Sequence, residues 1–246
     1  VNEAIAVTGS TASTNTLFYT SGFETVNVQD VAVAIDLTTN GSGITTWDFD
    51  DDAGTSAQQV LTLNADYDQA TTAKLGAADD VVNSANVALT LNMASDDLLV
   101  GTTITGGTGT DTINVTAKGG TSVLTNVTGV EQINVLAGAA GTEVVSITTN
   151  ADAAITALKT LTVDASALTS ASATMTLDAS AETDGYVHVT GGAAIDTITG
   201  GLLADTIIGG GGADILDGAG GDDIITGGDG ADIITAGAGD DTITGG

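Results

Sequence analysis

The chain has 246 residues, of which 42% are hydrophobic and only 3% aromatic, and its 32 acidic and three basic side chains give a formal net charge of −29. A chain with so few basic residues cannot form a phosphate-binding surface, so we exclude nucleic acid and anionic lipid as partners. Cysteine is absent and no apolar run could span a bilayer, so we expect neither disulfide bonds nor membrane insertion.

Residues 1–185 predict short β-strands. Small branched aliphatics, 34 glycines and few aromatics favour many thin β-rungs over one bulky core. The motif SGFETVNV at 21–28 returns as TGVEQINV at 128–135, and an aliphatic-Thr-aliphatic-Asn/Asp pattern recurs four times. Its alternation predicts strands with one buried face. Two copies, LTVDASA and MTLDASA, predict consecutive rungs of one stack. Residues 151–159 suit either a short helix or a turn.

Three acidic segments within this region are candidate calcium loops. Residues 47–54 read WDFDDDAG; the late glycine and a Gln at the twelfth position argue against an EF-hand, which leaves an irregular calcium loop or a solvated acidic loop. LGAADDVVN at 75–83 places Asp80 in a weak copy of the C-terminal repeat described below. GGTGTDTIN at 106–114 matches that repeat throughout, which favours a calcium site at Asp111 over an aspartate that caps its own turn.

The sequence does not indicate catalysis. His188 is the only histidine, so a Ser-His-Asp triad and a zinc site of histidines and cysteines both lack their parts. Paired carboxylates at 50–52, 79–80 and 96–97 could in principle hydrolyse glycosides, but sugar-binding grooves usually carry stacking aromatics, which are scarce here. We therefore expect a protein that is not an enzyme.

From Gly191 the chain reads in units of nine: GGAAIDTIT, GGLLADTII, GGGGADILD, GAGGDDIIT, GGDGADIIT, AGAGDDTIT and a final GG. The first six residues of each unit predict a turn, and the last three predict a short strand whose middle aliphatic points inward. Two units then complete one coil of a flattened spiral. The aspartates at the sixth position are Asp196, Asp205, Asp214, Asp223, Asp232 and Asp241.

Coils of 18 residues would place the aspartates in two stacks. Asp196, Asp214 and Asp232 share one edge of the spiral, and Asp205, Asp223 and Asp241 share the other. Carboxylates at the strand spacing of about 5 Å repel one another. A divalent cation between neighbouring loops would convert this repulsion into a bond, completed by backbone carbonyls. We expect several Ca²⁺ ions, and the further candidate ligands are Gly209, Gly211, Gly218, Gly220, Gly227 and Asp229.

Residues 191–246 resemble the RTX family, whose GGxGxDxUx repeats bind calcium in a parallel β-roll. Ala194 and Leu203 stand where the family has its second turn glycine, so the first two units are expected to hold weaker sites, or none, and to serve as a transition into the roll. The resemblance implies an all-β chain in which an irregular β-solenoid body at 1–185 continues into an RTX β-roll at 186–246.

Together with TGVEQINV and LTVDASA, these repeats resemble calcium-dependent bacterial S-layer proteins and other type I-secreted surface proteins. The resemblance implies a secreted, cell-surface structural protein that assembles with copies of itself into a lattice or filament, with surface polysaccharide as a further possible partner. Two alternatives stay open. The chain could be a calcium-rigidified spacer of a large RTX adhesin, or the secretion and folding module of a type I-secreted enzyme.

Overall fold

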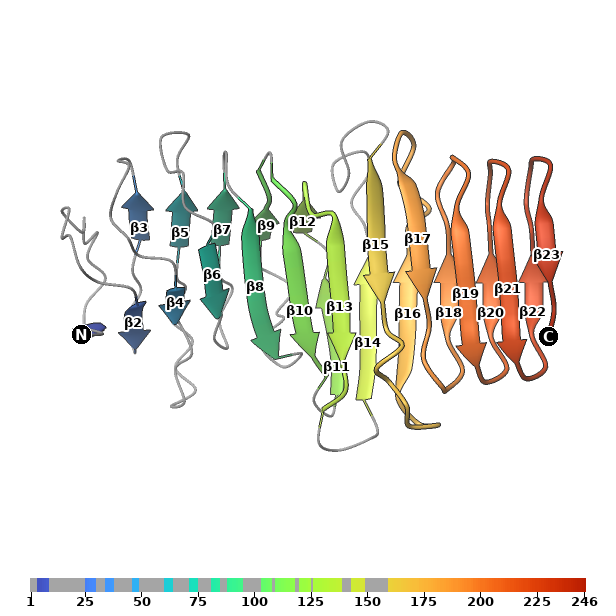
Figure 1. The fold of residues 1–246 in the computed structure, drawn as a ribbon, viewed down its shortest axis with the longest axis horizontal. Helices are drawn as coiled ribbons and strands as arrows, with labels where there is room; N and C mark the ends of the chain where they lie inside the picture. Colours follow the sequence, from blue (N-terminus) through green and yellow to red (C-terminus); the bar gives the residue numbers. More distant parts are fainter. Residues whose placement is uncertain are drawn as a thin grey trace.

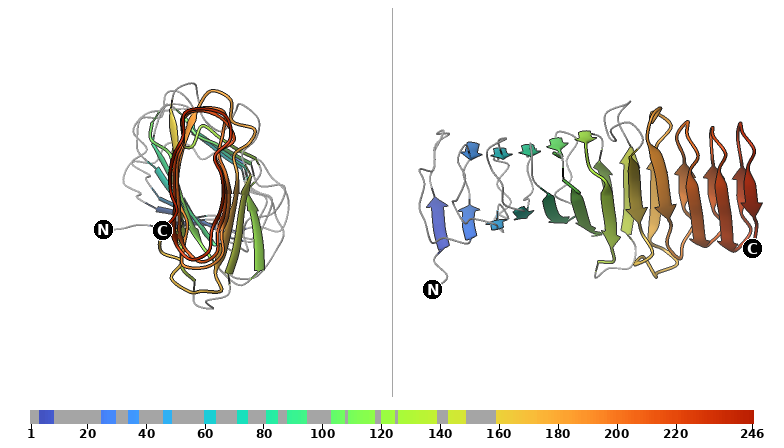
Figure 2. Two further views of the ribbon diagram at one scale, coloured as in Figure 1. Left: turned by 90° about the vertical axis from the view of Figure 1, so that its right-hand side faces the viewer. Right: turned by 45° about the horizontal axis from the view of Figure 1, so that its top comes forward.

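The chain folds into a stack of flattened β-coils. The computed structural model describes seven short strands before residue 85, together with residues 88–94, 103–107, 109–117, 120–124, 126–138, 143–148 and 159–246. Coils follow one another from the N-terminus to the C-terminus of an elongated body (Figure 1) and appear end-on as a flattened oval (Figure 2). Every strand pairing is parallel. The all-β solenoid predicted from the sequence is confirmed.

One face of the stack is a single 12-stranded sheet, here called the long sheet. Its strands, in spatial order, are β1 (Ala4–Thr8), β2 (Thr25–Gln29), β4 (Thr46–Asp48), β6 (Thr71–Lys74), β8 (Leu89–Ala94), β10 (Thr112–Thr116), β13 (Gln132–Leu136), β15 (Thr160–Asp164), β17 (Tyr186–Thr190), β19 (Thr206–Gly211), β21 (Ile224–Asp229) and β23 (Thr242–Thr244). No helix occurs among the described residues, and accordingly none there is long and apolar enough to cross a membrane.

The opposite face is divided between two sheets. The N-terminal sheet contains β3 (Ala34–Leu37), β5 (Val60–Leu63), β7 (Val81–Ser84), β9 (Thr103–Thr105) and β12 (Asn126–Thr128). The C-terminal sheet contains β11 (Gly120–Leu124), β14 (Glu143–Thr148), β16 (Thr174–Asp178), β18 (Thr197–Thr199), β20 (Ile215–Asp217) and β22 (Ile233–Thr235). The segment between β10 and β13 supplies a strand to each, so the second face changes sheets within this one coil.

The two rungs LTVDASA and MTLDASA are not consecutive members of one stack, as their similarity suggested. The first forms β15 in the long sheet, and the second forms β16 in the C-terminal sheet. They are therefore the two opposite faces of the same coil. The two strands show the same alternation because each turns its apolar side chains toward the interior of the coil. The sequence pattern therefore does not indicate which of the two sheets a strand joins.

An inner row of aliphatic side chains fills the stack. In the long sheet Leu91, Ile113, Ile133, Val163, Val189, Ile207 and Ile225 stand in register, and each is at most 2% exposed. Ile198 and Leu216 continue the matching row of the C-terminal sheet. A fully buried aliphatic of this size contributes about 1.5–3 kcal/mol. The inward aliphatic predicted two residues after each aspartate is thus confirmed for these units.

The spacing of coils becomes regular near the predicted boundary at residue 185. From Asp196 onward, equivalent residues of successive coils are 18 positions apart. Strand β17 nevertheless pairs with β15 on one side and with β19 on the other, so the long sheet runs through this point without a break. The roll is therefore a regular continuation of the same stack, and the division into two domains stays a prediction.

Candidate metal-binding loops

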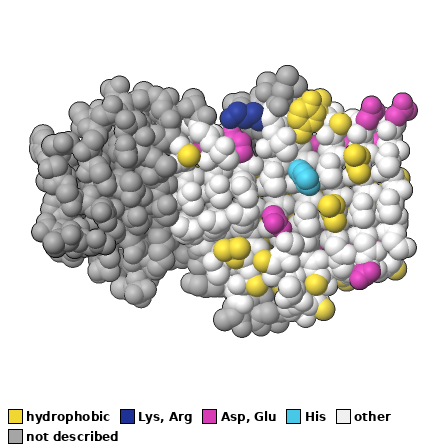
Figure 3. Space-filling view, viewed as in Figure 1, with side chains coloured by type: hydrophobic (Ala, Val, Ile, Leu, Met, Phe, Trp, Pro, Cys, Tyr) yellow, Lys and Arg dark blue, Asp and Glu magenta, His cyan; other side chains and the backbone are white. Residues whose placement is uncertain are grey.

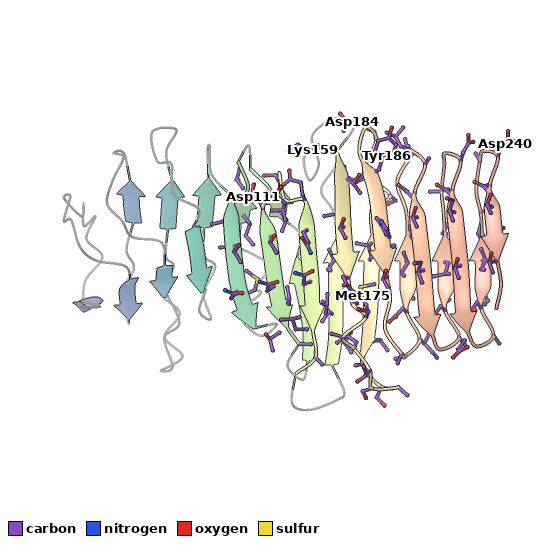
Figure 4. All side chains as sticks on the ribbon, in the orientation of Figure 1. Asp111, Lys159, Met175, Asp184, Tyr186 and Asp240 are labelled. Atoms are coloured by element: carbon purple, nitrogen blue, oxygen red, sulfur yellow. The ribbon has the colours of Figure 1, made fainter. Side chains whose placement is uncertain are left out.

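The repeat aspartates lie in two stacks of loops, one along each edge of the solenoid. Asp205, Asp223 and Asp241 directly precede strands of the long sheet, and Asp196, Asp214 and Asp232 directly precede strands of the C-terminal sheet. This is the arrangement that the nine-residue period predicts. Asp111 precedes β10 of the long sheet and so lies along the same edge as Asp205; Figure 4 shows it at that edge, where Asp240 also lies.

Within each stack, one carboxylate oxygen joins a coil to the coil before it. The Oδ1 atom of each aspartate accepts a hydrogen bond from the backbone N–H of the equivalent residue one coil earlier. The pairs are Met175 to Asp196 (2.7 Å), Asp196 to Asp214 (2.8 Å), Asp214 to Asp232 (3.0 Å), Val187 to Asp205 (2.7 Å), Asp205 to Asp223 (2.7 Å) and Asp223 to Asp241 (2.9 Å). The hydrogen bonds between successive coils therefore use Oδ1 of each carboxylate and leave Oδ2 for a second partner.

In the first two units the second oxygen is also satisfied by backbone. Oδ2 of Asp196 accepts the N–H of Gly192 at 2.6 Å, and Oδ2 of Asp205 accepts the N–H of Gly201 at 2.6 Å. In each case the donor is the second residue of the same nonapeptide. These two carboxylates cap their own turns, and protein groups occupy both of their oxygens.

In the third and fourth units the second oxygen has no donor. Oδ2 of Asp214 and Oδ2 of Asp223 are buried and accept no hydrogen bond. The second residues of these units, Gly210 and Ala219, have positive φ angles of 103° and 66°, whereas Gly192 does not. The N–H of Ala219 instead donates to Oδ1 of Asp217 at 3.0 Å. The changed turn therefore leaves a buried carboxylate oxygen without a proton donor, which is unfavourable unless another ligand supplies positive charge.

A backbone carbonyl oxygen lies close to each of these carboxylates. Oδ2 of Asp214 and the carbonyl oxygen of Gly227, one coil later, both lie 2.5 Å from the point where a Cβ on Gly209 would stand. The two oxygens are therefore at most twice that distance apart, and only a glycine fits beside them. The same arrangement recurs around Gly218, with Asp223 and Ala236, and around Gly227, with Asp232 and Gly245. Carboxylate and carbonyl oxygens together are the ligands that Ca²⁺ prefers.

The remaining predicted loop residues hold the loops together. Gly211 stands in register with Asp229, and the carbonyl of Asp229 accepts the N–H of Gly212 at 2.7 Å. Gly220 forms a parallel bridge with Ala238. Asp80, the paired carboxylates at 50–52, 79–80 and 96–97, and residues 151–158 lie outside the described residues.

Asp111 has the geometry of the first two units. Its Oδ1 accepts the N–H of Leu89 and its Oδ2 accepts the N–H of Gly107, each at 2.7 Å. The N–H of Asp111 donates to Oε2 of Glu131 at 2.9 Å, and Nζ of Lys159 lies 2.7 Å from Oε1 of the same glutamate. Of the two interpretations of Asp111 in the sequence analysis, this geometry is that of an aspartate that caps its own turn. Sequence reasoning missed Glu131 and Lys159, because neither belongs to the nine-residue repeat.

Burial raises the pKa of the five buried loop aspartates, Asp111, Asp196, Asp205, Asp214 and Asp223. Desolvation raises the pKa of Asp196 and of Asp205 to about 6, against the lowering effect of their backbone hydrogen bonds, and the next carboxylate in the stack raises it further. Burial also raises the pKa of Asp214 and of Asp223. Repulsion from the next carboxylate in the stack adds to this effect, from Asp232 on Asp214 and from Asp241 on Asp223. Each stack is therefore a row of partly desolvated like charges, and a cation between the coils would relieve it.

Among the described residues, no three His, Cys, Asp or Glu side chains come together as a metal cluster. A cation in these loops would therefore rely on single carboxylates and on backbone oxygens. Parallel coils with glycine turns and one inward-facing aspartate per loop define a β-roll with stacked aspartate loops as the class of this region.

The comparison with known families gives the same result. The family described as RTX calcium-binding nonapeptide repeat (4 copies) matches residues 190–225 and 217–246. The C-terminal part of this chain thus consists of RTX calcium-binding repeats, as the sequence pattern predicts. Comparisons with curated proteins and with solved structures give no significant match.

Proposed function

We propose that the chain is a calcium-dependent structural segment of a secreted, cell-surface protein, in which calcium completes the folding of the C-terminal roll. The observation that carries the proposal is the pair of buried oxygens, Oδ2 of Asp214 and Oδ2 of Asp223, that have no hydrogen-bond donor and lie beside backbone carbonyls. RTX repeat proteins are typically secreted, which supports the location. The role we propose is not catalytic.

The turn geometry suggests which loops bind the metal. We assign calcium to the positions around Gly209, Gly218 and Gly227, where Oδ2 of Asp214, Asp223 or Asp232 meets a carbonyl of the following coil. Asp196, Asp205 and Asp111 are not ligands in this proposal, because backbone N–H groups already occupy both of their oxygens. The first two units would then serve as a metal-free adaptor on which the calcium-dependent coils stack.

The mechanism would be linkage between metal binding and folding. With a net charge of −29, the compact chain repels itself. A metal that binds only the folded loops lowers the free energy of the folded state, and above the dissociation constant this effect grows with the logarithm of the metal concentration. Weak sites with dissociation constants of roughly 10⁻⁴–10⁻³ M, typical of extracellular calcium modules, would fill outside a cell and stay empty inside it.

Hydrogen–deuterium exchange with mass spectrometry tests the proposal. Amides of residues 209–246 should be protected in millimolar calcium and exchange rapidly in EGTA. Amides of β15, β17 and the first two units should stay protected in both, because their carboxylates are satisfied by backbone. Magnesium at the same concentration is the control and should not restore protection. Equal protection of residues 209–246 with and without calcium would contradict a calcium-dependent fold.

The elongated stack also suits the spacer alternative, in which the chain separates other parts of a large adhesin (Figure 1). Electron microscopy of the purified protein in calcium distinguishes the two functions. Ordered sheets or filaments would support the assembling structural protein, and isolated rods at every concentration would support the spacer.

A further inference from the structure

The outer face of the long sheet carries a row of aligned residues without any charge. From β8 onward the strand register places one residue of each strand in this row: Thr90, Thr112, Gln132, Thr162, His188, Thr206, Ile224 and Thr242. We call it the threonine row, because threonine fills most of its positions. No acidic residue occurs in it, although the chain has 32 acids. This row therefore presents no carboxylate to a partner.

A second outer row runs beside it and is held in place by amide hydrogen bonds. Nδ2 of Asn114 donates to Oδ1 of Asn92 at 2.9 Å, and Nδ2 of Asn134 donates to Oδ1 of Asn114 at 2.8 Å. Nε2 of Gln132 donates to Oδ1 of Asn134 at 3.0 Å. Asp164 follows in register and is the only acidic residue of this row in the part of the long sheet from β8 to β23. Hydrogen bonds within the chain thus already fix the orientation of these side-chain amides.

The face is mostly uncharged over its described part. Figure 3 views this side of the molecule and shows mainly white surface, which is backbone and uncharged polar side chains together, with scattered hydrophobic side chains and few acids. The outer face of the C-terminal sheet also has an uncharged row, formed by Ser146, Thr176, Thr197, Ile215 and Ile233. Its second row carries two carboxylates, Asp178 and Asp217, whereas the second row of the long sheet from β8 onward carries only Asp164. A copy of this chain would therefore meet carboxylates more densely on the C-terminal sheet than on the long sheet.

The size of the long sheet suits a stable contact. At the usual strand spacing and rise per residue, 12 strands of about five residues cover about 55 Å by 16 Å, or about 900 Å². A stable protein–protein contact covers about 800 Å² on each partner. Threonine is stiff at χ1 and the asparagines are held by one another, so little side-chain entropy would be lost when a second surface packs against them.

We infer that the outer face of the long sheet binds the same face of a second copy of this chain, with the two threonine rows opposed. The inference rests on the proposed structural function and names the contact through which copies associate. Two copies of charge −29 can approach closely only where neither presents acids, because opposed like charges cost several kcal/mol. A two-fold contact places the same row on both sides and meets this condition.

Sedimentation equilibrium of the whole chain in millimolar calcium tests this contact. The wild type should form dimers or larger species as its concentration rises, and more readily at higher salt, which screens the remaining repulsion. The double variant Thr112→Glu with Thr162→Glu places a charge twice in the row of each copy. We expect its dissociation constant to rise at least about tenfold.

The matched control is Ser146→Glu with Thr197→Glu, which adds the same charges, two strands apart, to the uncharged row on the outer face of the C-terminal sheet. We expect it to associate as the wild type does. A wild type that stays monomeric, or a control pair that weakens association as much as the test pair, would overturn the inference. Circular dichroism of the same samples separates the two proposals: a folded monomer in calcium rejects this contact alone, whereas failure to fold on calcium rejects the proposed function.

Discussion

The backbone N–H of Asp205 donates to Oδ1 of Asp223 over 2.7 Å, although the two residues are 18 positions apart. They occupy the same place in successive loops, yet their second carboxylate oxygens differ. Oδ2 of Asp205 accepts the N–H of Gly201, whereas Oδ2 of Asp223 accepts no hydrogen bond and is buried. This difference separates an aspartate whose two oxygens both accept backbone hydrogen bonds from one whose second oxygen has no donor.

Replacing each of these two aspartates should therefore affect calcium differently. We expect Asp223→Asn to reduce the number of bound calcium ions measured by isothermal titration calorimetry. Asp205→Asn should keep the number of ions and lower the unfolding free energy by about 1–3 kcal/mol, because its amide would place a donor against the N–H of Gly201. An equal loss of calcium in both variants would show that Asp205 is also a ligand.

Ala219 offers a test of the turn itself. It is the only non-glycine residue with positive φ among the described residues, at 66°. The left-handed conformation costs an L-residue about 1–2 kcal/mol, and glycine avoids this cost but loses more chain entropy on folding. We expect Ala219→Gly to stabilise the calcium-bound protein by up to about 1 kcal/mol in urea unfolding. Ala213→Gly, at an exposed position without positive φ, is the control and should destabilise it.

The buried aspartates predict that the metal-free protein becomes less stable as pH rises. The folded-state pKa of Asp196 and of Asp205 is raised to about 6 from 3.8, so the folded chain binds protons that the unfolded chain has already lost. Their stabilising contribution is present below about pH 4 and is lost as pH rises through about 6. The thermal midpoint of metal-depleted protein, followed by circular dichroism, should fall over this window. The variant with both Asp196→Asn and Asp205→Asn should lose most of that dependence, and a midpoint that rises with pH would contradict the assignment.

The contacts around Asp111 predict that this part of the stack is stable without metal. The Lys159 side chain is 40% exposed, so Lys159→Met should cost less than about 1 kcal/mol. Glu131→Ala removes the acceptor for the N–H of buried Asp111 and should cost more, about 1–3 kcal/mol. Urea unfolding in EGTA measures both effects. Neither variant should change the calcium stoichiometry, and a change would place a calcium ion at Asp111 after all.

The sequence by itself determined the repeating architecture. The nine-residue period fixes two stacks of aspartates, because two units complete a coil and every second unit returns to the same edge. Alternation of apolar and polar residues fixes the inner row, since a strand turns every second side chain to the same side. Ala194 and Leu203 also indicate that the first two turns differ, because a Cβ at that position opposes the positive φ that Gly212 and Gly221 adopt.

Only the tertiary structure decided which carboxylates lack a donor. Residues 106–114 match the repeat at every position, and Gly107, Gly192 and Gly210 are all glycines at its second place. Yet Gly107 and Gly192 donate to their aspartates, whereas Oδ2 of Asp214 accepts nothing. Glycine at the second place permits its N–H to point toward the aspartate or away from it. We infer that the neighbouring loops in the stack determine which orientation is adopted. A carbonyl of the following coil lies beside both carboxylates, that of Gly129 beside Asp111 and that of Gly227 beside Asp214, so the missing N–H donor is what distinguishes Asp214.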